Sequence, residues 1–111
     1  MVPIEVWEAA RAEYHCVLGP LKREDVTPIR WRGKVVGFFR PHDCVHGCRI
    51  GPIFVAREFR GRGLAARVYA GIAGPLVACV RDDNPASVRL HEKAGFVRWR
   101  RYAAGWWWRR P

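Results

Sequence analysis

The spacing of apolar and polar residues divides the chain into short helices and strands. Apolar and charged residues are mixed at helical spacing from Pro3 to Gly19, and Pro20 follows. We expect one amphipathic helix there, because proline suits a first helical turn and Gly-Pro ends one. Residues 26–43 then contain two runs rich in β-branched and aromatic residues, hinged near Gly33, as in a β-hairpin.

The next pattern is a strand, a glycine-rich turn, a helix and a second strand. Residues 48–56 are almost all apolar, which is typical of a buried central strand. Leu64, Val68 and Ile72 are four residues apart and form one helical stripe. Residues 76–80 are a short apolar run. A strand, helix and strand in about thirty residues form a βαβ unit with parallel strands.

Two further patterns complete the chain. Asn84 is a good N-cap, Pro85 a good first helical residue and Gly95 a good C-terminal stop, so they frame a short helix. The last residues form two strands joined through residues 103–105. This order of elements predicts a single α+β domain around one mixed sheet of about six strands, flanked by three helices.

Composition narrows the class of protein. The chain has 111 residues, half of them apolar, which suits one hydrophobic core and excludes a disordered basic tail. Its 20 Lys and Arg against 10 Asp and Glu give a formal net charge of +10, which favours anionic partners. We see no signal peptide and no apolar run of membrane-spanning length. We therefore expect a cytoplasmic, soluble protein with no membrane partner and with reduced cysteines.

The glycine-rich turn after the third strand is a candidate anion site. It consists of Arg60, Gly61, Arg62, Gly63, Leu64 and Ala65. A strand that runs into such a turn and then a helix directs unpaired N–H groups and the positive end of the helix dipole at one point. The glycines let the backbone approach a phosphate, and the arginines can donate charge-assisted hydrogen bonds. The turn is neither a Walker loop nor a Rossmann fingerprint.

This turn and a later segment resemble two sequence blocks of the GNAT acetyltransferase superfamily. RGRGLA fits the signature Q/R-x-x-G-x-G/A, and residues 84–96 resemble the block N-x-x-A-x-x-L-Y-x-K-x-G-F. The helix and strand between them are in the family's order. The resemblance covers a core of residues 26–111, preceded by a shortened helical region in residues 1–25.

The resemblance implies an N-acetyltransferase that passes an acetyl group from acetyl-coenzyme A directly to an amine in a ternary complex. By the same resemblance residues 60–65 hold the pyrophosphate of acetyl-coenzyme A. Main-chain groups of Phe54 and Val55 bind the pantetheine arm, and Asn84 contacts it. No metal is expected.

The candidate catalytic residues depart from the family's pattern. The family's tyrosine, which protonates the departing thiolate, is replaced by His91, on one helical stripe with Asn84 and Ser87. His91 is either a proton donor or a packing residue, and Ser87 is an alternative hydrogen-bond donor to the sulfur. His46 is a candidate general base.

The segment around His46 has a second interpretation. Four residues alternate along it: His42, Cys44, His46 and Cys48. In an extended strand they share one face, and such N and S ligands bind zinc. A flat strand cannot surround an ion tetrahedrally, however, and the usual paired spacing is absent. An ordinary hairpin connection is therefore favoured over a metal site.

The N-terminal region bears on which acceptor the protein uses. The short N-terminal region predicts an acceptor side that is open, or completed by a second subunit, and that suits a large or anionic acceptor.

Residues 99–111 interleave Arg and Trp, as in a surface for single-stranded nucleic acid. The same pattern is typical of strands that pack on a helix or in a homodimer. Residues 106–108 are consecutive tryptophans, so at least one is expected to be exposed or in a dimer contact.

Two alternatives to the enzyme follow from these patterns. One is a basic nucleic-acid-binding module on the GNAT fold, which the net charge and the tail favour. The other is a protein that binds the cofactor without catalysis and interacts with a partner.

Overall fold

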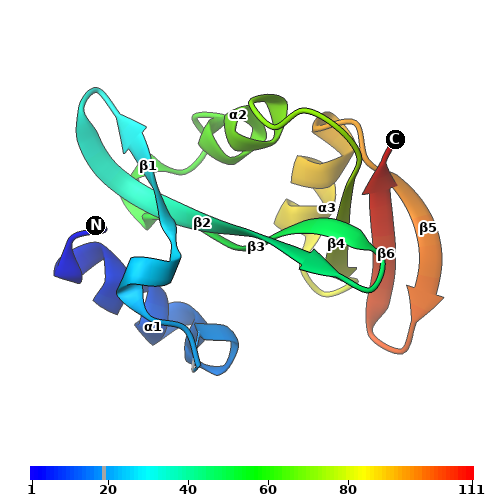
Figure 1. Cartoon of the computed structure of the whole chain (residues 1–111), viewed down its shortest axis with the longest axis horizontal. Coiled ribbons are helices and arrows are strands. Elements are labelled where there is room, and N and C mark those ends of the chain that lie inside the picture. The colour runs from blue at the N-terminus through cyan, green and yellow to red at the C-terminus, as the bar shows by residue number, and fades with distance from the viewer. Residues whose placement is uncertain (19) are drawn as a thin grey trace. The chain divides into compact units, whose positions relative to one another are not determined.

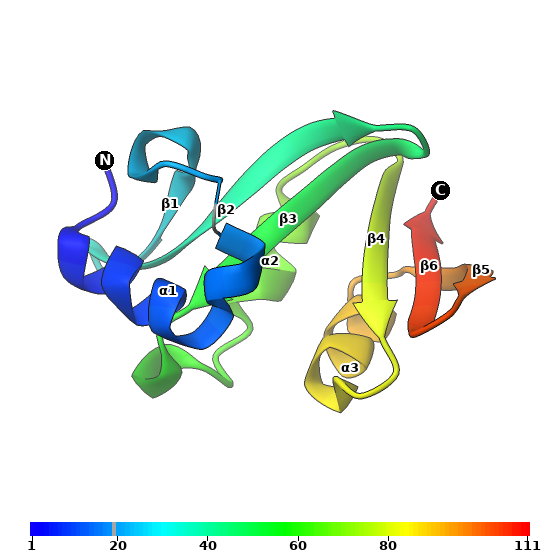
Figure 2. The same cartoon turned by 90° about the horizontal axis from the view of Figure 1, so that it is seen from below.

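The structure is a computed structural model that describes residues 1–18 and 20–111, with side chains for residues 1–13 and 20–111. The helices are α1 (Ile4–Leu18), α2 (Leu64–Ala70) and α3 (Pro85–Lys93), and the short 3₁₀ helices are η1 (Arg23–Asp25) and η2 (Arg57–Phe59). The strands are β1 (Thr27–Trp31), β2 (Lys34–Cys44), β3 (Gly47–Val55), β4 (Leu76–Arg81), β5 (Val97–Tyr102) and β6 (Gly105–Arg110). Their order along the chain confirms the predicted order (Figures 1 and 2). The predicted helix stop at Gly19 and the side chain of Cys16 lie outside the described residues.

The six strands form one mixed sheet in the order β1-β2-β3-β4-β6-β5. β1 and β2 are antiparallel, and their turn places Arg32 and Gly33 at positive φ. β3 and β4 are parallel, as predicted, and the single pair Arg49 and Val77 forms their ladder. β6 lies antiparallel to β4 and to β5. The predicted α+β fold, with a six-stranded mixed sheet and three helices, is therefore confirmed.

The chain divides into two compact units, which are described separately below. The first unit contains residues 1–40 and 51–64, and the second contains residues 41–50 and 65–111. The β2–β3 hairpin contributes to both, since its outer end belongs to the second unit. That the whole chain forms one domain stays a prediction.

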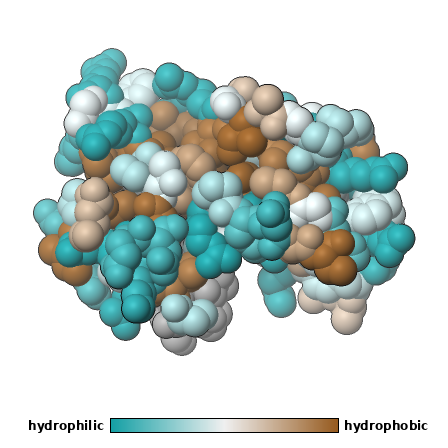
Figure 3. Space-filling model, viewed as in Figure 1, coloured by the Kyte–Doolittle hydropathy of each residue, from teal (hydrophilic) through white to brown (hydrophobic). Residues whose placement is uncertain are grey.

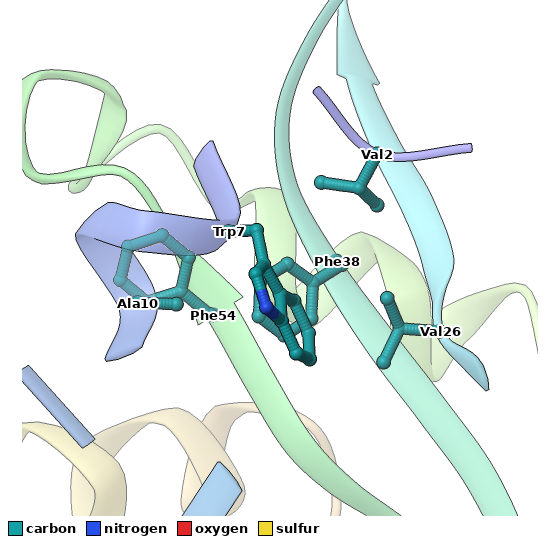
Figure 4. Packing of buried hydrophobic residues seen from close by; sticks show 6 residues of the cluster. All are labelled: Val2, Trp7, Ala10, Val26, Phe38 and Phe54. Carbon is teal, nitrogen blue, oxygen red and sulfur yellow. The ribbon is translucent and has the colours of Figure 1, made fainter. Parts of the chain in front are cut away.

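The core of the first unit lies where α1 packs on β2 and β3 (Figure 4). It consists of Val2, Trp7, Ala10, Val26, Phe38 and Phe54. The ring centroids of Trp7 and Phe38 are 5.3 Å apart, and those of Phe38 and Phe54 are 5.5 Å apart. Each of these buried aromatic side chains contributes about 2–3 kcal/mol through its removal from water. This packing fixes α1 on the end of β3, just before the glycine-rich turn.

The second unit has its own aromatic cluster between α2 and α3. Tyr69, His91 and Phe96 contact one another, with ring centroids between 5.0 and 5.3 Å apart. In β4 the neighbours Val77 and Ala78 are both buried. Since neighbouring residues of a strand point to opposite faces, β4 is covered on both sides.

The described helices differ from the prediction at one end. α2 ends at Ala70, so Ile72, the last residue of the predicted helical stripe, lies beyond it. The guanidinium of Arg110, on β6, donates hydrogen bonds to three carbonyl oxygens at this end. They belong to Tyr69, Ile72 and Gly74. Ile72 lies beyond the helix because these carbonyls are satisfied by an arginine instead of by further helical turns. None of the described helices is both long and apolar enough to cross a membrane.

The C-terminal strands bury their tryptophans more fully than predicted. Trp108 is buried, and Trp106 and Trp107 are half-buried, so none of the three is exposed in this chain. Neighbouring tryptophans point to opposite faces of the strand, and on each face another side chain packs against a tryptophan ring. The guanidinium of Arg98 lies over Trp106, and the ring of His46 lies against Trp107. A dimer contact through these strands stays a prediction.

Candidate functional site

The glycine-rich turn between η2 and α2 has a backbone that requires glycine. Gly61 has φ +80° and Gly63 has φ +73°, values at which any other side chain strains the backbone. A Cβ added at either position would meet no atom within 4 Å. The turn therefore leaves open space beside its backbone, in which a phosphate has room to approach.

Arg60 ties the turn to the rest of the first unit. Its Nε donates a hydrogen bond to the Val55 carbonyl at 2.8 Å, and its Nη2 forms an ion pair with Glu13 Oε2 at 2.8 Å. Its guanidinium also lies 5.6 Å from the centroid of the Phe54 ring. The arginine predicted as a phosphate ligand thus already has a carboxylate partner on α1.

Arg62 is placed differently. Its guanidinium is 5.6 Å from the ring centroids of both Trp31 and Phe59. Its side chain is exposed, and no ion pair among the described residues includes it. Of the two arginines of the turn, Arg62 is the one with charge available for an anion.

The remaining predicted cofactor residues of this region have buried or half-buried side chains. Phe54 belongs to the core of the first unit, and Val55 offers a carbonyl that Arg60 occupies. Leu64, at the start of α2, is buried, and Ala65 is half-buried. These residues therefore offer mainly main-chain groups to a ligand, as the resemblance implies for the pantetheine arm.

A cavity of about 770 Å³ lies in the first unit, between α1, β2, the end of β3 and η2. Its lining includes the apolar side chains of Val6, Val36 and Phe54, the carboxylates of Glu5 and Glu58, and the cations of Lys34 and Arg57. No sequence pattern predicts this cavity, because its lining comes from separate segments that only the fold brings together. Apolar walls with charged side chains of both signs suit a small organic molecule that carries polar groups.

In the second unit, Asn84 and Ser87 form the predicted start of α3. The side-chain oxygen of Asn84 accepts a hydrogen bond from the Ser87 backbone N–H at 3.1 Å, with Pro85 in the first turn. The predicted N-cap is therefore confirmed. Ser87 is half-buried, and its Oγ lies 3.4 Å from Nδ1 of His91. The predicted stripe of Asn84, Ser87 and His91 is thus a chain of polar contacts.

His91 lies inside the second unit and is only 4% exposed. Its Nδ1 is 2.7 Å from the Ser87 carbonyl oxygen, and since a carbonyl only accepts, Nδ1 carries the proton. Its Nε2 then accepts a hydrogen bond from the Tyr69 hydroxyl at 2.9 Å. Burial lowers the pKa of His91, against the hydrogen bond to the Ser87 backbone, and burial also raises the pKa of Tyr69. His91 is therefore neutral at neutral pH, with both ring nitrogens engaged.

His46 lies in the tight turn of the β2–β3 hairpin, so the favoured hairpin connection is confirmed. The turn at Val45 and His46 interrupts the strand, and the four alternating His and Cys residues therefore do not lie along one extended strand. Among the described residues no group of three or more His, Cys, Asp and Glu is arranged to hold a metal ion. The His46 ring contacts Trp99 and Trp107, with centroids 5.4 and 4.6 Å away.

Comparison with known proteins places this arrangement in a family. The sequence matches the model of the Acetyltransferase (GNAT) family over residues 3–96. This range includes both the glycine-rich turn and residues 84–96. The chain therefore belongs to the GNAT acetyltransferase family, as its resemblance to the two sequence blocks implied.

Solved structures share the fold. A protein of Bordetella pertussis described as a GnaT-family acetyltransferase is 26% identical, with a TM-score of 0.59 over 72% of this chain and 59% of its own. Ard1 of Thermoplasma volcanium is 19% identical, with a TM-score of 0.63 over 96% and 88% of the two chains. The yncA protein of Salmonella typhimurium, solved with its cofactor acetyl-CoA, is 20% identical, with a TM-score of 0.53 over 72% and 60%.

Two of these proteins extend well beyond the part that the present chain matches. The present chain spans 59% of the length of the Bordetella pertussis protein and 60% of the length of yncA. No curated protein matches the sequence significantly.

Proposed function

We propose that the chain is an N-acetyltransferase that uses acetyl-coenzyme A as co-substrate and transfers the acetyl group directly to an amine. The observation that carries the proposal is the family match over residues 3–96, which includes a turn with two glycines at positive φ. The structure of yncA with acetyl-CoA supports the choice of co-substrate.

The turn is suited to the pyrophosphate of the co-substrate. Open space lies beside Gly61 and Gly63, so backbone N–H groups can approach phosphate oxygens closely. Arg62 adds an exposed guanidinium, while Arg60 holds the turn in place through Glu13. In this proposal the exposed Asn84 contacts the pantetheine arm, as the family resemblance implies.

The co-substrate supplies an activated acetyl group: the amine nitrogen forms a C–N bond to the thioester carbon as the C–S bond breaks and the thiolate leaves. Ser87 is the group that we propose as hydrogen-bond donor to the sulfur, because its hydroxyl is half-buried in the first turn of α3. His91 supports that turn through its bond to the Ser87 carbonyl. His46 stays a candidate for the base that removes the amine proton.

The cavity of the first unit is a candidate site for the amine. Glu5 and Glu58 are exposed at its lining and would pair with an ammonium group, and Val6 and Val36 would contact an apolar chain. Lys34 and Arg57, also exposed there, would bind an anionic part of the same acceptor. In this proposal Glu5→Gln and Glu58→Gln raise the KM for the amine more than they lower kcat.

Thermal unfolding with and without acetyl-coenzyme A tests the proposal. Ligand at a hundred times its Kd should stabilise the fold by about 2.7 kcal/mol. Gly63→Asp should abolish this stabilisation by placing a carboxylate beside the pyrophosphate. Gly33→Asp is the matched control, because Gly33 also has positive φ, +81°, and open space around its Cβ position.

The outcomes separate the alternatives. No stabilisation of the parent chain by millimolar acetyl-coenzyme A overturns the proposal. Stabilisation without release of the coenzyme thiol in the presence of small amines or peptides supports a protein that binds the cofactor without catalysis. Equal losses in the two glycine variants show that the turn is not the phosphate site.

A further inference from the structure

The bulge in β5 gathers aromatic and basic side chains on one face of the C-terminal hairpin. The register between β5 and β6 shifts between Arg98 and Arg100, so Trp99 is an extra residue. Arg98 is paired with Trp108, whereas Arg100 is paired with Trp107, on the opposite face. Trp99 and Arg100 therefore both accompany Trp107.

The outer end of the β2–β3 hairpin adds to this face. His46 contacts the rings of both Trp99 and Trp107, and the Arg49 guanidinium lies 5.6 Å from the Trp107 centroid. Arg100 and Arg109 lie over Trp99, at 4.6 and 5.3 Å from its centroid. We call this surface the Trp99 face. It consists of His46, Arg49, Trp99, Arg100, Trp107 and Arg109.

The Trp99 face carries positive charge without a matching acid. No ion pair among the described residues includes Arg49, Arg100 or Arg109. Arg100 and Arg109 are exposed, and hydrophilic residues line much of the edge that β5 forms in the view of Figure 3. Stacking on a tryptophan ring orders a guanidinium in advance, so less entropy is lost when it binds an anion.

The opposite face of the hairpin is used within the protein. Arg101 forms an ion pair with Asp82 at 2.6 Å, and Arg110 binds the carbonyls that follow α2. Arg98 lies over Trp106 and Trp108. Two exposed arginines of the hairpin, Arg100 and Arg109, therefore lie together on the Trp99 face, whereas Arg98 is exposed on the opposite face.

We propose that the Trp99 face binds single-stranded nucleic acid. Its arginines would bind phosphates, and its half-buried rings and guanidinium planes offer stacking surfaces for bases. An acidic peptide would use only the charge and leave the aromatic half of this surface without a role.

Fluorescence anisotropy with a labelled single-stranded oligonucleotide tests the proposal. A length of about 20 nucleotides exceeds the roughly 4–16 that one small domain covers. The variant Arg100→Gln/Arg109→Gln should raise Kd roughly tenfold and reduce the slope of log Kd against log salt by about 1.4. The matched control is Arg67→Gln/Arg89→Gln, which removes the same charge from exposed positions of α2 and α3.

Each outcome decides for or against the proposal. It is supported if the Trp99-face variant loses affinity and salt dependence while the control keeps most of both, with equal thermal unfolding in the two variants. It is overturned if both variants lose equally, or if no binding is seen near about 0.1 M salt. It is also overturned if polyglutamate of equal charge competes as well as the oligonucleotide, or if acetyl-coenzyme A displaces it.

Discussion

The hydroxyl of Tyr69 lies 2.9 Å from Nε2 of His91 in the interior of the second unit. The other ring nitrogen donates to the Ser87 carbonyl, so Nε2 carries no proton and accepts from the tyrosine. The pair satisfies two buried polar groups that would otherwise lower the free energy of unfolding. It joins α2 to α3 through their side chains.

Removing the tyrosine hydroxyl should therefore destabilise the protein. Tyr69→Phe keeps the ring but leaves Nε2 of His91 buried without a donor, at a cost of about 1–3 kcal/mol. The free energy of unfolding in urea measures this cost. Combining the change with His91→Leu should restore part of the loss, because neither polar group then remains. Additive effects of the two changes would contradict the role of the hydrogen bond.

The same pair predicts how stability depends on pH. The pKa of His91 is lowered from its ordinary 6.5 in the folded state, so below that pH the unfolded chain binds a proton that the folded chain does not. Stability is complete above about pH 6.5 and falls as the pH decreases toward the folded pKa, by up to about 1.4 kcal/mol per pH unit. Urea unfolding of the parent and of His91→Phe, from about pH 7 to about pH 5, isolates this effect. Parallel profiles of the two proteins would exclude it.

The two arginines of the glycine-rich turn should respond differently to substitution. Arg60→Gln breaks the ion pair with Glu13, which is partly exposed, and should lower the free energy of unfolding by about 0.5–1 kcal/mol. Arg62→Gln should change stability by less than about 0.5 kcal/mol. It should instead raise the Kd for acetyl-coenzyme A roughly tenfold. Urea unfolding and ligand titration of both variants distinguish the roles, and the reverse pattern would refute the assignment.

Replacing Arg110 even with lysine should lower the free energy of unfolding. Its guanidinium donates to the carbonyls of Tyr69, Ile72 and Gly74, and a single ammonium cannot reproduce that fork. Arg110→Lys should therefore cost about 1–3 kcal/mol in urea unfolding. The neighbouring Arg109→Lys, at an exposed position, should stay within about 0.5 kcal/mol. Equal effects would show that these hydrogen bonds do not stabilise the end of α2.

Features set by neighbouring residues could be predicted from the sequence. The N-cap at Asn84, the parallel βαβ strands and the glycine-rich turn each depend on a few consecutive residues with distinct conformational preferences. Their order, together with the two blocks, was enough for the fold and the family.

Contacts between distant residues could not be predicted in this way. The bond from Arg60 to Glu13 joins positions 47 apart, and the bond from Tyr69 to His91 joins positions 22 apart. Sequence spacing therefore placed His91 on the correct stripe of α3 without indicating that a tyrosine of α2 occupies its Nε2. It also did not indicate which arginine of the turn has a carboxylate partner.

The extra residue in β5, Trp99, affects which side chains the strand presents at the surface. Deleting Trp99 would make Arg98 and Arg100 direct neighbours opposite Trp108 and Trp107, so the register would become regular and Arg100 would stay on the face of Trp107. The chain would keep all 20 of its Lys and Arg and its formal net charge of +10. One deleted codon would thus remove the ring over which Arg100 and Arg109 lie, while the amount of positive charge and the face that presents it stay the same.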